Sequence, residues 1–456
     1  MRDSRIHALF GAQPGELRPA LWAAAYFFFV LASWYVLRPL RDAMGLVGGT
    51  RNLPYLFVGT LVITVLLNPL FSQLVSRYSR RVFIPATYRF FSLNLLIFFV
   101  LIRALPPDRQ VWLARVFFVW ASAYTLFAVA VFWGLMADLF EGGRAKRLFP
   151  FIGVGGTLGA IAGSSMTTGL AERIGMAQLI LVAIVLLELA LLAMRQACRY
   201  CDELRSLRSS PQEESGQSER ALDADERRIG GTAWDGLIRT LRSPYLIGIS
   251  LYILAMTVTS SLLYFEQGRV VDEAITDRAA RAAFFARIDL FVNVLCLISQ
   301  TLIAGRILTW AGVGANLALM PLITASGFAA QGGGAALTAI FWFQVARRAG
   351  EYALARPGRE VLFTVVSRAD KYKAKSLIDT FVYRGGDAMG AGLYSLLSAK
   401  DSFDAGQLFR VVLAISAAWM VVCVLLDIGY RLRASRVVRD ARPGRVLRAS
   451  AQSAVD

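Results

Sequence analysis

The sequence predicts an all-α polytopic membrane protein with twelve transmembrane helices in two six-helix halves. The composition gives the first indication, because 56% of the 456 residues are hydrophobic and only 18% are charged, whereas soluble domains carry about 25% charged residues. The mean hydropathy of +0.52 agrees with this. The second indication is that apolar runs of about 20 residues, enough to cross a bilayer about 30 Å thick, recur along nearly the whole chain. A polar segment in the middle divides these runs into two sets.

The apolar runs give six predicted spans on each side of the polar segment. The first six lie at 20–38, 53–75, 82–102, 112–138, 148–170 and 176–195. The second six lie at 245–265, 284–305, 312–331, 336–355, 376–397 and 408–430, and charges or glycines interrupt the fourth, tenth and eleventh spans. The predicted domains are an N-terminal half at 1–195, a cytoplasmic polar linker at 196–243, a C-terminal half at 244–432 and a basic cytoplasmic tail at 433–456.

Loop charges predict the orientation of the chain, because Lys and Arg accumulate on the cytoplasmic side of membrane proteins. With the N-terminus inside, and with Arg38 and Arg195 at the ends of their spans counted with the adjoining loops, the inner segments hold 32 Lys and Arg residues and the outer loops hold 10. Both termini are therefore expected in the cytoplasm, and the first span is expected to be an anchor and not a cleaved signal peptide. The net charge of +17 is then a topology signal, so nucleic acid is not an expected partner.

Cysteine and histidine usage argues against metal and redox chemistry. Cys198 and Cys201 form a CxxC, but a zinc site needs two further ligands at suitable spacing, and none is nearby. Cys296 and Cys423 lie in apolar runs and are expected to be packing residues. His7, the single histidine, lies in the N-terminal tail, so proton coupling inside the membrane would have to use carboxylates. We expect no cofactor. The sequence shows no nucleophile paired with a base, so we do not expect an enzyme.

An internal repeat relates the two halves. The segment RAKRLFPFIGVGGTLGAIAG at 144–163 aligns with KAKSLIDTFVYRGGDAMGAG at 373–392, and each contains a Gly-Gly pair. Both copies enter the fifth span of their half from the cytoplasm, so the repeat is parallel. Two six-helix halves related in this way resemble a major facilitator-type carrier.

The glycines of the first copy are expected to serve helix packing. The run from Gly153 to Gly159 superficially resembles a dinucleotide-binding loop, but that motif needs a preceding strand and a βαβ unit. Small residues at helical spacing instead let two membrane helices approach closely. A phosphate site at a helix terminus is the alternative. The packing residues are Gly155, Gly156, Gly159, Ala160 and Gly163.

The first span ends in a cluster of charges. Arg38 and Arg41 are three residues apart and can project from one helix face as a cationic clamp. Arginine suits phosphate or carboxylate because its planar fork binds two oxygens at once. The alternatives are that these side chains reach out to the membrane interface or that they pair with Asp42. Pro39 lies between them and is expected to interrupt the helix.

Other charged residues lie in or beside predicted spans, where a charge at the bilayer centre costs about 2.5–3.5 kcal/mol. Glu188 stands among leucines and is expected to be a buried protonated group or a helix–helix contact. The remaining residues either form ion pairs between helices or contact substrate: Arg89, Glu266, Asp289 beside Arg287, Arg347, Arg348, Glu351, Asp379, Arg384 and Asp387. Six arginines lie in the probable central region, which favours an anionic substrate: Arg38, Arg41, Arg89, Arg347, Arg348 and Arg384.

The segment ARPGREVLFTVVSRADKYKAKSLIDTFVYRGGD at 355–387 resembles the nucleotide translocase family, the ATP/ADP exchangers of obligate intracellular bacteria and plastids. Four further segments agree: YVLRPLRDAMG at 35–45, VFWGLMADLF at 131–140, KRLFPFIGVGGTLGAIAGS at 146–164 and SPYLIGISLYILAMTVTSSLLYFEQ at 243–267. The resemblance covers both halves and most spans, and it is strongest in spans one, five and eleven.

The resemblance implies transport roles for particular residues. The basic residue of the family's first-span motif falls on Arg41, and the glutamate of its seventh span falls on Glu266. The glutamate of its fourth span has no counterpart, since its place falls near Ala121. The position of the lysine in the family's eleventh span falls near Arg384 and Asp387 in this chain. Two of four charges are therefore lost or altered, which favours a divergent anion over strict ATP/ADP exchange.

The sequence thus predicts a monomeric secondary transporter of an anionic, phosphorylated or nucleotide-like metabolite in a bacterial inner membrane. Its expected partners are a small anionic substrate, ATP and ADP included, and membrane lipids. The expected substrate-binding residues are Arg38, Arg41, Arg89, Glu266, Arg347 and Arg384; the expected coupling or gating residues are Asp42, Glu351, Asp379 and Asp387. Two alternatives stay open: a proton-coupled transporter of another small solute or drug, and a non-transporting membrane scaffold or lipid-handling partner with a degenerate carrier fold.

Overall fold

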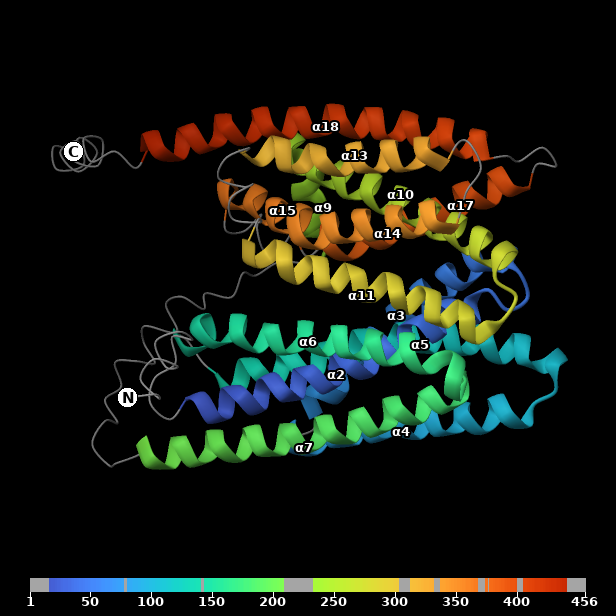
Figure 1. Ribbon diagram of the computed structural model, residues 1–456. Coiled ribbons are helices and arrows are strands. Elements are labelled where there is room, and N and C mark those ends of the chain that lie inside the picture. The colour runs from blue at the N-terminus through green and yellow to red at the C-terminus, as the bar shows by residue number, and fades with distance from the viewer. Residues whose placement is uncertain are drawn as a thin grey trace. The chain divides into compact units, whose positions relative to one another are not determined.

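The structure, a computed structural model, describes residues 16–77, 80–140, 143–208, 233–302, 312–331, 337–367, 374–375, 377–399 and 405–440, and every regular element in these ranges is helical (Figure 1). The chain forms two compact units. Unit 1 comprises Met1–Arg227 and Phe265–Leu297, and unit 2 comprises Arg228–Tyr264 and Ile298–Asp456. A segment of the predicted C-terminal half therefore clusters with the N-terminal half, and the domain boundaries drawn from the sequence stay a prediction.

Unit 1 is built from long helices that coincide with the first six predicted spans. They are α2 (Leu17–Gly45), α3 (Leu53–Arg77), α4 (Arg80–Ala104), α5 (Pro107–Leu139), α6 (Gly143–Ile174) and α7 (Met176–Arg208), with a 3-10 turn at Thr50–Asn52. The end of α10 (Pro244–Ala274) and most of α11 (Arg278–Leu302) complete the unit. Since α7 continues to Arg208, the start of the predicted polar linker is helical.

Unit 2 holds the start of α10 and the helices that follow α11. They are α9 (Ala233–Arg242), α13 (Gly312–Gln331), α14 (Leu337–Gly350), α15 (Arg356–Leu362), α17 (Tyr383–Ser398) and α18 (Ala405–Asp440). Two π-helical turns, Glu351–Ala355 and Ile378–Val382, join α14 to α15 and lead into α17. A 3-10 turn at Phe363–Val365 ends α15.

Ten helices in the described ranges are long and apolar enough to cross a membrane. Predicted spans ten and eleven are not among them, because α14 has 14 residues and α17 has 16, and a π-helical turn adjoins each. Charged side chains in the same segments lower their hydropathy. The chain is nonetheless an integral membrane protein built from helices, and spans ten and eleven are the irregular members of the predicted twelve.

The prediction that Pro39 interrupts the first span is wrong. Pro39 lies inside α2, which continues as one helix to Gly45. Proline removes one backbone donor, but α2 is the central helix of unit 1 and packs against α5, α6 and α7 (Figure 1). Packing on three sides holds the helix together across the missing hydrogen bond.

The close packing of α2 with α6 confirms the role predicted for the glycines. A Cβ atom built at Gly155 would meet the backbone of Ala24, and one at Gly159 would meet the backbone of Phe28, each inside van der Waals contact. Only glycine allows the two backbones to approach this closely.

The second copy of the repeat packs in a similar way. In unit 2, a Cβ atom at Gly386 would overlap the side chain of Thr257, and one at Gly390 would lie 2.7 Å from Cβ of Ser261. Both partners belong to α10, the first span of its half, as α2 is of the other half. Helix five of each half therefore lies against helix one through small residues.

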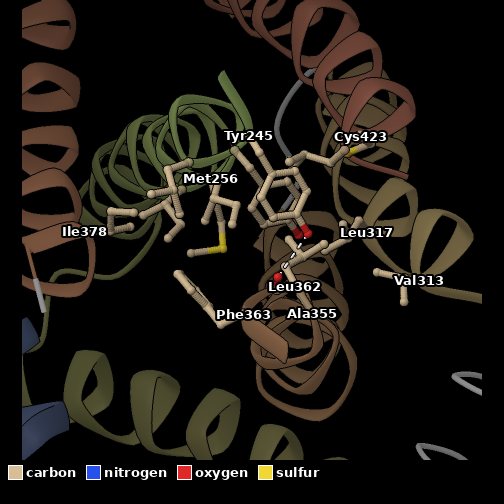
Figure 2. Packing of buried hydrophobic residues seen from close by; sticks show 14 of the residues in the cluster. Tyr245, Met256, Val313, Leu317, Ala355, Leu362, Phe363, Ile378 and Cys423 are labelled. Atoms are coloured by element: carbon tan, nitrogen blue, oxygen red, sulfur yellow. Dashed lines mark hydrogen bonds between the residues drawn. The ribbon is translucent and has the colours of Figure 1, made fainter. Parts of the chain in front are cut away.

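The core of unit 2 lies between α10, α13, α15 and α18 (Figure 2). Tyr252 and Trp419 meet edge to face, with ring centroids 5.4 Å apart. The hydroxyl of Tyr245 donates a hydrogen bond to the carbonyl of Leu362 at 3.0 Å, which fixes the end of α15 against α10 (Figure 2). This core holds the irregular, charged segments on either side of the two π-helical turns.

Candidate functional site

A cavity of about 420 Å³ lies in unit 2 where α10, α15, α17 and the two π-helical turns meet. Its volume is within the range of small-molecule sites. Basic, acidic and tyrosine side chains line it together with two apolar ones: Arg356, Arg359, Arg384, Glu351, Glu360, Asp379, Tyr252, Tyr352, Tyr383, Met256 and Ala355. Three residues predicted from the sequence, Glu351, Asp379 and Arg384, are thus brought together.

The π-helical turns explain how charged residues reach this cavity. A π-helical turn inserts one extra residue into a helix and is frequent at functional sites. Here one turn begins at Glu351 and the other contains Asp379. Beyond the first turn, α15 continues the helix and adds Arg356, Arg359 and Glu360 to the same wall.

The ion pair between Arg359 and Asp379 is loose and poorly satisfied. Nη2 of Arg359 lies 3.6 Å from Oδ1 of Asp379, which is beyond hydrogen-bond distance. Arg359 is only 8% exposed, and its Nε has no hydrogen-bond partner among the described residues, nor does Oδ1 of Asp379. A buried group without a partner costs about 1–3 kcal/mol. The pair therefore retains unused donor and acceptor capacity inside the cavity.

A second pair lies at the start of α17. Nη1 of Arg384 is 3.6 Å from Oδ2 of Asp387, and the Arg384 side chain is about one-third exposed. The hydroxyl of Ser261 donates to Oδ1 of Asp387 at 3.4 Å, so Asp387 connects Arg384 to α10. The structure therefore brings the predicted coupling residue Asp387 next to the predicted binding residue Arg384.

Arg347 is fully buried and is not one of the residues that line the cavity. Its guanidinium donates to the carbonyl of Met256 at 2.8 Å and to the hydroxyls of Ser260, Thr259 and Thr324 at 3.0–3.4 Å. Its Nη1 also lies 3.8 Å from Glu351. These contacts tie α14 to α10 and α13, and they orient Glu351 at the cavity wall.

The predicted residues of α2 lie in unit 1. Nη1 of Arg38 is 3.3 Å from Oδ1 of Asp289 on α11, a carboxylate that is 2% exposed. Arg41 pairs with Asp42 at 2.6 Å, and its guanidinium lies 5.0 Å from the ring centre of Phe118. Both arginines therefore have acidic partners, and the cationic clamp stays a prediction.

Glu266 and Arg89 also lie in unit 1. Oε1 of Glu266 accepts a hydrogen bond from Arg269 at 2.6 Å, one helical turn further along α10. Arg89 lines a different cavity, at the ends of α4 and α7. Glu188 makes the helix–helix contact expected of it, since Ser92 on α4 donates to its Oε1 at 3.5 Å.

Sequence reasoning missed Arg356, Arg359 and Glu360. The predicted tenth span ends at residue 355, which places these charges in the inner loop. A signal was present, because ARPGRE continues the four-residue spacing from Glu351 through Ala355 to Arg359. Arg359 and Glu360 follow Arg356 by three and four residues, which places the three side chains on one helix face.

No family model and no curated protein matches the chain. Solved structures do match in fold. A bacterial homologue of the iron transporter ferroportin in an inward-facing state aligns over 90% of this chain and 99% of its own, with a TM-score of 0.62 and 13% identity. A POT family transporter in complex with a thioalcohol-conjugated peptide aligns over 91% of this chain and 96% of its own, with a TM-score of 0.57 and 10% identity. A mutant of the nucleoside transporter NupG aligns over 91% of this chain and 99% of its own, with a TM-score of 0.55 and 11% identity. These similarities show a major facilitator-like fold.

Proposed function

We propose that the chain is a secondary active transporter of an anionic, phosphorylated or nucleotide-like metabolite, working by alternating access, with the unit 2 cavity as its substrate site. The observation that carries the proposal is the meeting of Arg356, Arg359 and Arg384 around one cavity whose ion pairs are loose. The fold shared with peptide, iron and nucleoside transporters supports it.

Substrate would bind by replacing carboxylates at the arginines. Phosphate and carboxylate oxygens form charge-assisted, two-pronged hydrogen bonds with a guanidinium, about twice as strong as neutral ones. At 3.6 Å from Arg359, Asp379 forms no such bond, so an oxyanion that approaches Arg359 more closely gains contacts that Asp379 does not make. Tyr252, Tyr352 and Tyr383 add hydroxyl donors and ring faces, which suit a substrate that carries both a phosphate and a planar base.

The carboxylates would act as counter-charges in the empty carrier. Asp379 and Asp387 keep Arg359 and Arg384 neutralised when no substrate is bound, and substrate oxygens would take over that role. An empty carrier that restores its own ion pairs can rearrange without substrate, whereas a carrier whose arginines stay unneutralised without substrate would be limited to exchange. We place the chain in a bacterial inner membrane as a monomer with both termini in the cytoplasm, following its Lys and Arg distribution. The charges of α2 (Arg38, Arg41 and Asp42) and Glu266 stay a proposed second set of transport residues.

The test begins with ligand binding. Purified full-length protein in detergent is screened by thermal shift against ATP, ADP, nucleoside monophosphates, inorganic phosphate and uncharged nucleosides. A ligand that binds the folded state stabilises it by about 2.7 kcal/mol at a hundredfold excess over its dissociation constant. Protection by the phosphorylated compounds and not by the nucleosides is the expected result.

Transport is then measured in proteoliposomes with Arg359→Gln and Arg384→Gln. Each substitution removes a charged hydrogen-bond donor, worth about 1.5–3 kcal/mol, so substrate affinity should fall about tenfold or more. Arg103→Gln is the control, because Arg103 stacks on Phe99 at the end of α4 in unit 1. Unchanged uptake in both cavity variants would show that the unit 2 cavity is not the substrate site.

A second candidate is a proton-coupled transporter of another small solute. Glu351, Glu360 and Asp379 line the same cavity as the arginines, and carboxylates are suitable carriers for a proton. Uptake driven by a pH gradient, without competition by nucleotides, and its loss in Asp379→Asn would favour this candidate over anion exchange.

A further inference from the structure

Unit 1 contains a second cavity, of about 780 Å³, which shares no lining residue with the cavity of unit 2. It lies where the beginning of α4 and the end of α7 run side by side at the edge of the unit (Figure 1). Its walls are partly apolar, from Ile84, Pro85, Leu135 and Met194. Its polar groups are Arg89, Arg195, Arg199, Asp202, Glu203 and the thiol-bearing Cys198.

The charge at this cavity is unevenly compensated. Nε of Arg199 lies 3.1 Å from Oε1 of Glu203, so one of the three arginines is paired on its own helix. Arg89 and Arg195 are exposed and have no ion-pair partner among the described residues. Two guanidinium groups, one from each helix, therefore face a shared hollow beside an apolar wall.

Exposed apolar side chains lie within about one helical turn of each of the two arginines. Phe90 and Leu93 on α4 are 59% and 56% exposed, and Leu192 on α7 is 54% exposed. Such side chains are suited to acyl chains in a protein that spans the membrane. Basic pockets between membrane helices at the cytoplasmic face are suited to anionic lipid headgroups, and the loop charges predict that these helix ends lie on that face.

We propose that the cavity between α4 and α7 is a binding site for an anionic phospholipid of the cytoplasmic leaflet. Arg89 and Arg195 hold the headgroup phosphate, and the acyl chains lie along Phe90, Leu93 and Leu192. This goes beyond the proposed transport function and does not depend on it, because none of these residues belongs to the unit 2 cavity. Charge complementarity to two arginines and continuity with an exposed apolar surface distinguish a lipid from a free phosphate.

The test measures lipid binding by purified full-length protein in a neutral detergent. Bound lipid is counted by native mass spectrometry, and protection against heating is followed with phosphatidylglycerol, phosphatidylcholine and inorganic phosphate. Phosphatidylglycerol should bind and protect, while the other two should do neither at equal concentration. Equal protection by phosphatidylcholine would reduce the site to an apolar surface, and equal protection by inorganic phosphate would make it a soluble-anion site; either outcome overturns the proposal.

Substitutions locate the binding. Arg89→Gln and Arg195→Gln should each weaken phosphatidylglycerol binding about fivefold, and together about thirtyfold, which corresponds to about 1 kcal/mol for each arginine at an anionic surface. Arg103→Gln, on the same helix as Arg89 but at its other end, should bind like the wild-type protein. Wild-type affinity in the double variant contradicts the proposal.

A measurement on the unaltered protein guards against misfolded variants. A photoreactive phosphatidylglycerol should label peptides from 84–93 and 192–203, and excess unlabelled phosphatidylglycerol should suppress the labelling. Labelling spread evenly over all lipid-facing helices would contradict a specific site.

Discussion

The ion pair between Arg38 and Asp289 offers a quantitative test of the helix arrangement in unit 1. It joins α2 to α11 at 3.3 Å, and the side chains are 17% and 2% exposed. Two opposite charges at about 4 Å interact by about 4 kcal/mol at an effective dielectric constant of about 20. Desolvation offsets part of this, and breaking a buried pair by removing one partner costs about 3–5 kcal/mol.

The exposed fractions of the two side chains decide which single substitution lowers the free energy of unfolding more. Arg38→Gln leaves a carboxylate at a nearly inaccessible position, so we expect a loss of about 3 kcal/mol. Asp289→Asn leaves Arg38, whose long side chain can turn toward solvent, so we expect about 1.5 kcal/mol. The double variant removes both charges of the pair and should lose no more than Arg38→Gln alone. The expected coupling energy is therefore about 1.5 kcal/mol, near the upper end of values for membrane proteins.

The assay is equilibrium unfolding of purified protein in mixed micelles, followed for the four members of the double-mutant cycle. Arg287→Gln is the matched control on the same helix, because its pair with Glu172, at 3.7 Å, is about half exposed on both sides and should contribute less than about 1 kcal/mol. Strictly additive losses, or losses in Arg38→Gln no larger than in the control, would refute the reasoning.

The same unfolding assay tests three further features of the packing. Gly159→Ala should destabilise by about 1–3 kcal/mol, because the added Cβ overlaps the backbone of α2, whereas Gly153→Ala, whose Cβ meets nothing within 4 Å in the described residues, should be neutral. Arg347→Met should cost about 2–3 kcal/mol, since four hydrogen bonds at about 0.6 kcal/mol each are lost; wild-type stability would show that the network is not formed. Tyr245→Phe should cost about 1 kcal/mol through the lost hydrogen bond to Leu362, and an unchanged midpoint would contradict that bond.

Much of the fold follows from the sequence because helix length and hydropathy are local properties. Each of the twelve predicted spans coincides with a helical segment, and the glycines of α6 lie where their spacing predicted. The errors occur where tertiary packing overrides a local signal. Pro39 has the chemistry of a helix breaker, yet α2 passes through it because neighbouring helices support the backbone on three sides.

The candidate site was only partly predictable, because ion pairs depend on contacts distant in sequence. Arg38 finds Asp289 on another helix, although Asp42 is nearer along the chain. Arg89 lines the α4–α7 cavity, a location that its charge and its position in a span do not reveal, and its predicted role in substrate binding stays a prediction. Arg359 was counted as a loop charge, because a π-helical turn followed by a further helix is not visible in hydropathy.

The repeat shows how a site can be added to one half of a symmetric fold. In both halves, helix five contacts helix one at glycines, and the absence of side chains there lets the two helix backbones lie close together. In α17 that separation brings Asp387 within 3.4 Å of the Ser261 hydroxyl on α10, and it sets Arg384 at the cavity wall. The first copy has Gly155 where the second has Arg384, and there the same close approach serves packing alone. The contact between helix five and helix one, common to both halves, thus determines where charged side chains can be placed. In unit 2, helix five has charged residues at these positions and forms part of the cavity wall.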